Sequence, residues 1–292
     1  MSKEKKRGEK KVKLIPVIAG LLVICAVLSA GCVSSSDDSE WKTLSSGLSV
    51  KAAAGAAAMA EKLAQAKSAC EGVCADAALM ENSVDAHAFA KEEHDKYGLD
   101  ANTLVILVDS TGTGHCSNGE HIYYSESGRL INGALKEQVF VSYSSPADSL
   151  EMTDYVCVLK KLASSKDAKA GGEDAVITHV SIYVPAEEFV HLYTDAINSE
   201  SNGFILDEDG EMQYRYLPLG LLINGNNFFT KMYQVKHLHN VDAVSEIGQV
   251  KHGVTVVCEI IIDGKNYIYT LSPLAGSEWV GASITPAELV RG

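Results

Sequence analysis

Two stretches of this chain recur about 100 residues further along, and this repeat constrains the fold more than any other feature of the sequence. Ile177–Phe189 is an apolar, strand-like run that ends in Pro-Ala-Glu, and the same three residues return at 286–288. Leu104–Gly112 and Phe204–Gly210 are each an apolar run, an aspartate, two small or polar residues and a glycine. Because both ends of the unit recur at nearly the same offset, the sequence predicts two tandem α+β modules, the first of which ends at Pro185.

Length and charge limit the classes of protein that this chain can belong to. The 292 residues hold two modules of roughly 100 residues each and leave roughly 100 for a leader and a helix. The net charge of −13 combines a basic segment, residues 1–13, with a strongly acidic remainder. An acidic body lacks the basic face that nucleic acid requires, so no nucleic-acid partner is predicted.

The N-terminal segment, residues 1–32, predicts a membrane anchor. Residues 14–31 form an uncharged apolar run behind the basic patch, at the short end of what spans a bilayer. The small residues directly before Cys32 resemble a bacterial lipobox, in which the chain is cleaved before the cysteine and the thiol is lipidated. A lipidated Cys32 and an uncleaved transmembrane helix both remain open. Both alternatives place the folded body on the extracytoplasmic side of the cell membrane.

Residues 33–98 are expected to form a tether and a long helix. The stretch 45–80 is rich in alanine and contains no proline, which favours a helix. Its apolar positions keep a seven-residue register that lines one seam. These positions are Ala56, Met59, Leu63, Ala66, Cys70, Val73, Ala77 and Met80. The seam either packs on the protein's own modules or forms a homodimer, in which Cys70 would face its twin and could be oxidised to an intermolecular bridge.

A shorter helix over 84–97, capped by Ser83, precedes the first module, residues 99–185. This module is expected to be a mainly antiparallel sheet of about five strands, with a short helix in the loop 125–136 and a solvated loop at 164–174. The expected strands are 104–108, 114–116, 139–143, 155–162 and 176–184. The second module, residues 186–292, repeats the plan after a helix over 186–198. Its expected strands are 204–206, 212–216, 253–262, 265–271 and 279–285, with a short helix at 241–250.

The ordered set of motifs resembles the double Cache sensor domains of bacterial chemoreceptors, histidine kinases and cyclic-dinucleotide enzymes. The resembling stretches are 128–142, 179–189, 203–212 and 264–289. The resemblance implies a long N-terminal helix followed by two tandem PAS-like modules. It also implies a small-molecule pocket in the membrane-distal module, here the first, between the sheet and the loop that carries the short helix.

The resemblance also points to the residues that would hold the ligand. Members that bind amino acids use a Tyr, an Arg and a Trp in the distal module, and Arg129 lies in the corresponding loop of this chain. Tyr124, Tyr143 and Tyr155 surround it in sequence, whereas no Trp lies between residues 42 and 278. Because a guanidinium binds a carboxylate through two hydrogen bonds, a carboxylate-bearing ligand is predicted.

No catalytic motif and no cofactor is predicted. The sequence contains no nucleophile elbow, HExxH or GxxxxGK[ST] pattern. His115 and His121 bracket Cys116, but no catalytic pattern accompanies them. His237 and His239 alternate along an extended stretch that could bind a metal, but a solvated loop is the preferred interpretation, and no metal is predicted. The cysteines that follow Cys32 number five, which is odd, and no disulfide framework is expected.

Two functions from different classes are compatible with these features. The chain is either a membrane-tethered sensing module without its own output domain, which passes its state to a separate membrane signalling partner, or a lipid-anchored solute-binding protein that serves a transporter. A sensor changes its dimer or its long helix on binding, whereas a capture protein only binds and releases its ligand.

Overall fold

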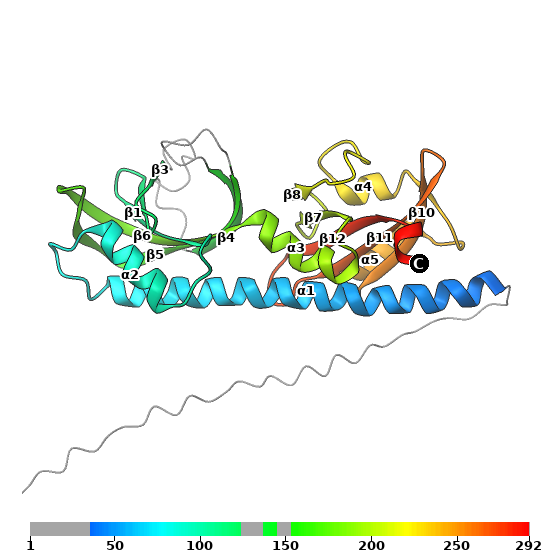
Figure 1. Ribbon diagram of the computed structural model, residues 1–292, viewed down its shortest axis with the longest axis horizontal. Coiled ribbons are helices and arrows are strands. Elements are labelled where there is room, and N and C mark those ends of the chain that lie inside the picture. The colour runs from blue at the N-terminus through cyan, green and yellow to red at the C-terminus, as the bar shows by residue number, and fades with distance from the viewer. Residues whose placement is uncertain (1–35, 124–136, 145–152, 292) are drawn as a thin grey trace, which may run out of the picture. The chain divides into compact units, whose positions relative to one another are not determined.

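The computed structural model describes residues 36–123, 137–144 and 153–291, and residues 36–292 form one compact unit. A long helix carries two antiparallel sheets of six strands each (Figure 1). The strand orders are β3-β2-β1-β6-β5-β4 and β8-β7-β12-β11-β10-β9. Five successive strands match between the two orders, because β2-β1-β6-β5-β4 corresponds to β8-β7-β12-β11-β10, whereas β3 and β9 have no counterpart. The predicted α+β class, with a long helix and tandem PAS-like modules, is confirmed.

The first part of the unit contains two helices and the first sheet. Their bounds are α1 Ser36–Ala77, α2 Ala86–Lys96, β1 Leu104–Asp109, β2 Thr113–Cys116, β3 His121–Tyr123, β4 Glu137–Ser144, β5 Thr153–Ala170 and β6 Glu173–Pro185. The second part begins with α3. Its elements are α3 Ala186–Ile197, β7 Asn202–Leu206, β8 Met212–Tyr216, α4 Phe228–Met232, β9 Lys236–His237, α5 Ala243–Val250, β10 Val256–Ile262, β11 Lys265–Pro273, β12 Val280–Pro286 and α6 Glu288–Arg291.

The seam of α1 is buried within the chain itself. All eight predicted seam residues are buried, and they pack in one cluster with side chains of both sheets and of α3. Cys70 is only 1% exposed, and its Sγ lies 3.6 Å from the carbonyl oxygen of Val180 and 3.8 Å from that of Val158. Of the two alternatives for the seam, packing on the protein's own modules is therefore the one that the structure shows, and Cys70 does not lie on the surface, where it could meet a second copy.

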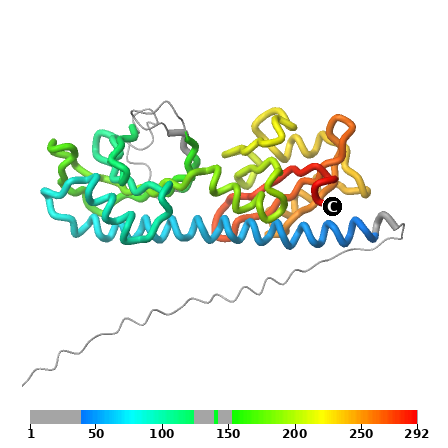
Figure 2. Tube along the Cα trace, in the orientation of Figure 1, coloured from blue at the N-terminus to red at the C-terminus, as the bar shows by residue number. Residues whose placement is uncertain are grey.

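The two halves of α1 contact different modules. Near its beginning, the Trp41 ring stacks on His239 of the second module at 4.4 Å between ring centroids. Near its end, Lys160 of the first sheet pairs with Glu71 at 3.2 Å. The tube drawing in Figure 2 follows the same course, with the start of the helix beside the second module and its end beside the first. The first module is thus the one farther from residue 36 along the helix.

The loop predicted at 164–174 is instead the end of a long hairpin. β5 and β6 stay paired from Lys166↔Ile177 to Ala170↔Glu173, and the turn uses Gly171 and Gly172, which both have positive φ. The reason is burial. Ala168 is 2% exposed and Ala175 is 8% exposed, so small side chains that carry little hydrophobic signal pack into the core.

The helix cap before α2 also differs from the prediction. Asp85, and not Ser83, is the N-cap residue, and its carboxylate accepts a hydrogen bond from the Ala88 backbone N–H at 3.0 Å. The adjoining Val84 carbonyl accepts a hydrogen bond from the backbone N–H of Lys169. The start of α2 is thereby tied to the end of the long hairpin.

The internal repeat extends to individual hydrogen bonds. Asp109 Oδ1 accepts from the backbone N–H groups of Thr111 and Thr113, at 2.8 and 3.0 Å. Asp207 Oδ1 accepts from those of Asp209 and Glu211 at 3.0 and 2.9 Å. The same aspartate turn therefore connects β1 to β2 and β7 to β8.

Candidate functional site

The resemblance implies a pocket between the first sheet and the loop 125–136, and that loop lies outside the described residues. One face of this sheet is turned away from α1. Side chains alternate along each strand, so Val156 and Val158 pack toward α1 while Tyr155, Cys157 and Leu159 lie on the other face. The cluster on that face comprises Leu104, Ile106, Val108, Cys116, Ile122, Cys157, Leu159 and Tyr183, with the half-buried Phe140 and Tyr155 packed against it. It is an apolar surface with three aromatic rings.

Of the four predicted ligand-binding side chains, the structure describes one. Tyr155 lies on this outer face, half-buried, with its ring 5.4 Å from that of Tyr183, and burial raises the pKa of its phenol. Tyr143 lies in β4, where its backbone pairs with Asp154, and nothing is described of its side chain. Tyr124 and Arg129 lie outside the described residues. The predicted constellation therefore stays a prediction.

Tyr183 and Phe140 share the face with Tyr155 but were not among the predicted ligand-binding residues. The signal was present in the period-two alternation of β6. Ile182 and Val184 pack toward α1, so Tyr183 between them has to lie on the outer face. The aromatic residues on this face suit an organic ligand better than a bare ion.

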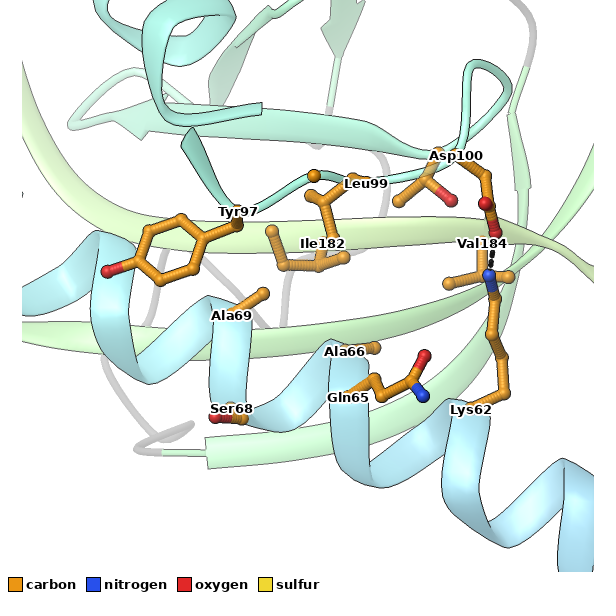
Figure 3. Close-up of a pocket in the computed structure, with 12 residues that line it drawn as sticks. Lys62, Gln65, Ala66, Ser68, Ala69, Tyr97, Leu99, Asp100, Ile182 and Val184 are labelled. Carbon is orange, nitrogen blue, oxygen red and sulfur yellow. Dashed lines mark hydrogen bonds and ion pairs between the residues drawn. The ribbon is translucent and has the colours of Figure 1, made fainter. Parts of the chain in front are cut away.

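A cavity of about 280 Å³ lies on the opposite side of the same sheet. It is bounded by α1, by the connection from α2 to β1 and by β6, and Figure 3 shows the Lys62–Asp100 ion pair at one end and Tyr97 at the other. Thr103, 2% exposed, also lines it, and its hydroxyl has no hydrogen-bond partner. The cavity is smaller than most ligand pockets of roughly 300–1,000 Å³, so a few waters or a very small solute suit it better than a metabolite.

One group among the described residues has the composition of a metal site. His87, His115 and His121 bring ligand atoms within 4.8 Å of one another beside the β2–β3 hairpin. His115 is held by Asp109, whose carboxylate Oδ2 lies 3.1 Å from Nε2. Burial lowers the pKa of His115 despite the opposing effect of Asp109. Burial raises the pKa of Asp109, but hydrogen bonds from Thr111, Thr113 and His115 outweigh it and leave that pKa below its usual value.

Comparison with known proteins assigns the fold. No family model and no curated protein matches this sequence. The extracellular domain of the putative histidine kinase soHK1S-Z6 superposes with a TM-score of 0.56 at 11% identity, covering 88% of this chain and 98% of that chain. The sensory domain of the Campylobacter jejuni chemoreceptor Tlp3, with isoleucine bound, has a TM-score of 0.47 at 12% identity, with 88% and 96% covered. The ligand-binding domain of the Pseudomonas fluorescens chemoreceptor CtaA, in complex with L-alanine, has a TM-score of 0.48 at 11% identity, with 86% and 98% covered.

These neighbours are sensory and extracellular domains of signalling proteins. The fold is thus the one shared with the extracellular domain of that putative histidine kinase, and it agrees with the double Cache resemblance found in the sequence. Within the part of the chain that the structure describes, no helix is both long enough and apolar enough to cross a membrane.

Proposed function

We propose that this protein is an extracytoplasmic small-molecule sensing module of a bacterial signalling system. The observation that carries the proposal is the shared fold, which extends over 88% of this chain and 98% of the extracellular domain of a putative histidine kinase. The aromatic outer face of the first sheet supports it further, because binding sites for organic ligands are mostly apolar and contain a few polar groups that fix orientation.

The ligand is proposed to be a small carboxylate-bearing molecule held by the first module. Arg129 supplies the cation for the carboxylate, and Tyr124, Tyr143 and Tyr155 supply hydroxyls and ring faces. The position of Tyr155, beside Phe140 and Tyr183 on an otherwise apolar face, supports this choice of surface. A tyrosine hydroxyl there can donate to a carboxylate without adding a charge.

The course of α1 supports a route from the first module toward a membrane anchor at residues 14–32. The helix begins at Ser36, inside the stretch that was expected to be a tether, contacts β10, β11 and β12 of the second module and continues to β5 and β6 of the first. A ligand that alters the packing of the first sheet on α1 would change the stability or position of that helix. This gives a physical path for a signal to a separate membrane partner.

Binding is tested on residues 36–292, which form one compact unit, after circular dichroism has verified the fold. A library of carboxylates, amino acids and related metabolites is screened by thermal shift, and at least one carboxylate is expected to raise the melting temperature. Arg129→Gln is expected to remove the shift. Arg215→Gln is the matched control, since Arg215 lies on β8 of the second module and bonds Asn226. A folded wild type that responds to no compound would contradict the proposal.

The anchor is tested separately in cells. Metabolic labelling with a fatty-acid analogue is expected to mark the full-length wild type and not Cys32→Ala. Labelling of both proteins or of neither removes the lipidation proposal and leaves the uncleaved helix over 14–31 as the tether. Protease added to intact spheroplasts should digest the body in either case if the body is extracytoplasmic.

A further inference from the structure

Three histidines from separate elements converge at the edge of the first sheet. His87 lies in the first turn of α2, His115 in β2 and His121 in β3, and the last two are directly opposite each other in the β2–β3 ladder. The ring centroids are 4.6 to 5.3 Å apart, and the rings stand nearly perpendicular to one another. His115 is 3% exposed, whereas His87 and His121 are half-buried, so the cluster can be reached from solvent.

Hydrogen bonds fix which nitrogens of two rings are available. His87 Nδ1 donates to the carbonyl oxygen of Cys116 at 2.9 Å, which leaves the lone pair on Nε2. His115 Nε2 donates to Asp109 Oδ2 at 3.1 Å, which leaves the lone pair on Nδ1. Each ring therefore offers one unprotonated nitrogen, and the tautomer of the ring is set by the acceptor at its other nitrogen. This is the arrangement that metal-binding histidines usually have.

Two nitrogens of the cluster are buried without a hydrogen-bond partner among the described residues. They are the Nδ1 atoms of His115 and His121. A buried polar atom without a partner costs roughly 1–3 kcal/mol, and such atoms are uncommon in native proteins. Two of them side by side are explained if a cation accepts both lone pairs.

The second module supplies an internal comparison. The residue equivalent to His115 is Gln213, six positions after Asp207, and its Nε2 donates to Asp207 Oδ2 at 3.1 Å. Glutamine therefore satisfies the aspartate turn as well as histidine does. The histidine in the first module adds a second nitrogen, and its ring centroid lies 5.3 Å from those of His87 and of His121. Among the described residues, the second module has no such group of histidines.

We propose that His87, His115 and His121 bind a divalent transition-metal cation, in the first place Zn²⁺, with Asp109 as the carboxylate behind His115. Three neutral imidazoles are a common ligand set for Zn²⁺, with a fourth position open to water or another ligand. Nitrogens bound at about 2.0–2.1 Å to a tetrahedral ion lie about 3.4 Å apart. Since the ligand atoms are all within 4.8 Å of one another, small side-chain rotations close the site.

The cation would connect α2 to the β2–β3 hairpin. Between these elements the structure already shows the bond from His87 to Cys116, and Asp109 is fixed in place by Thr111 and Thr113. A bound ion would therefore hold the first turn of α2 against the edge of the sheet, on the α1 side. The site is independent of the outer face to which the proposed carboxylate binds, so either proposal can fail without the other.

The test uses residues 36–292 with a removable tag that contains no histidine, stripped of metal with a chelator. Calorimetric titration with ZnCl₂ is expected to show one ion per chain, and Co²⁺ is expected to give the visible absorption of a four- or five-coordinate nitrogen site. The key variant is His115→Gln, because Gln213 shows that glutamine keeps the bond to the aspartate. Its affinity for Zn²⁺ is expected to fall at least about 100-fold with the metal-free melting temperature little changed.

Two further variants complete the design. Asp109→Asn replaces the Oδ2 acceptor behind His115 with an amide NH₂ group and is expected to weaken Co²⁺ binding about 10–100-fold. A Co²⁺ spectrum is still expected at higher metal concentration. His252 is an exposed histidine after α5, and His252→Gln is expected to bind Zn²⁺ and Co²⁺ as the wild type does. The proposal is overturned if the folded wild type takes up neither Zn²⁺ nor Co²⁺ stoichiometrically, or if His115→Gln binds them as tightly as the wild type does.

Discussion

Gly55 of α1 lies directly against the backbone of Tyr193 in α3. A Cβ atom at position 55 would stand 2.9 Å from Tyr193 Cα and 3.1 Å from its carbonyl oxygen. Tyr193 is fully buried, and its hydroxyl lies 2.9 Å from that of Thr270 in the second sheet. The two helices can therefore approach closely only because residue 55 has no side chain, and this contact joins α1 to the helix that links the two modules.

Gly55→Ala is expected to destabilise the protein by about 1–3 kcal/mol, because the new methyl group meets backbone that cannot rotate away. In an exposed helix the same change would stabilise by about 1 kcal/mol. Gly47→Ala provides that control, because Gly47 is exposed and an added Cβ there would meet no described residue outside its own stretch of helix within 4 Å. Urea unfolding of both variants gives the comparison, and equal stability would show that the close helix contact is absent in solution.

The fold could be predicted because its strongest signals are local or repeated. The seven-residue register identified the buried side of α1, and the recurring Asp and Pro-Ala-Glu motifs identified the two modules. The partner of the seam could not be predicted, because small residues such as Ala56 and Ala66 suit a close contact with any surface. The end of the β5–β6 hairpin was missed since Ala168 and Ala175, buried against the core, resemble loop residues in a stretch rich in Lys, Asp and Gly.

Glu259 is a fully buried carboxylate that holds the C-terminal end of the unit. Its Oε2 accepts from Arg291 Nη2 at 2.5 Å and from His239 Nε2 at 2.8 Å, and its Oε1 accepts from Asn266 at 3.0 Å. Glu259→Ala is expected to cost about 3 kcal/mol, because it leaves these donors without their acceptor. Glu278→Ala, at an exposed position, is expected to change the free energy of unfolding by less than about 0.5 kcal/mol. Similar denaturation midpoints for the two variants would contradict this account.

The candidate sites were less predictable than the fold. Tyr155 could be placed on the outer face from strand alternation, but contacts between a loop and a sheet depend on tertiary structure. The histidine cluster shows the same limit. No metal was predicted from His115 and His121. The third histidine, His87, is on another element, and only the packing of α2 on β1 and β2 brings it near them.

Buried thiols should be unreactive in the folded protein. Burial raises the pKa of both Cys116 and Cys258 to about 12, so very little thiolate is present at pH 8. Of the five cysteines that the structure describes, Cys74 alone is half-buried. Residues 36–292 are expected to show at most one fast-reacting thiol with a disulfide reagent, and five after unfolding in urea. Fast reaction of more than one thiol in the native protein would contradict the burial.

The stability of the second module should fall when the pH is lowered below the ordinary pKa of histidine. His237 lies with Nδ1 3.1 Å from the Val235 carbonyl oxygen and Nε2 3.2 Å from the Tyr269 hydroxyl. Burial lowers the pKa of His237 below the usual histidine value of 6.5, although the hydrogen bond to the Val235 carbonyl oxygen opposes this. Below pH 6.5 the unfolded chain therefore binds the proton before the folded chain does, so the free energy of unfolding decreases until the pH is below the folded-state pKa.

The measurement is urea unfolding at several values between about pH 7.5 and pH 5. His237→Gln is expected to give a shallower decrease in the free energy of unfolding than the wild type, with the remainder due to other groups such as His115, whose pKa is also lowered by burial. His252→Gln removes an exposed histidine and is expected to leave the wild-type dependence unchanged. If His237→Gln and His252→Gln have the same pH dependence, His237 is not buried as a neutral imidazole and its bond to Tyr269 does not persist in solution.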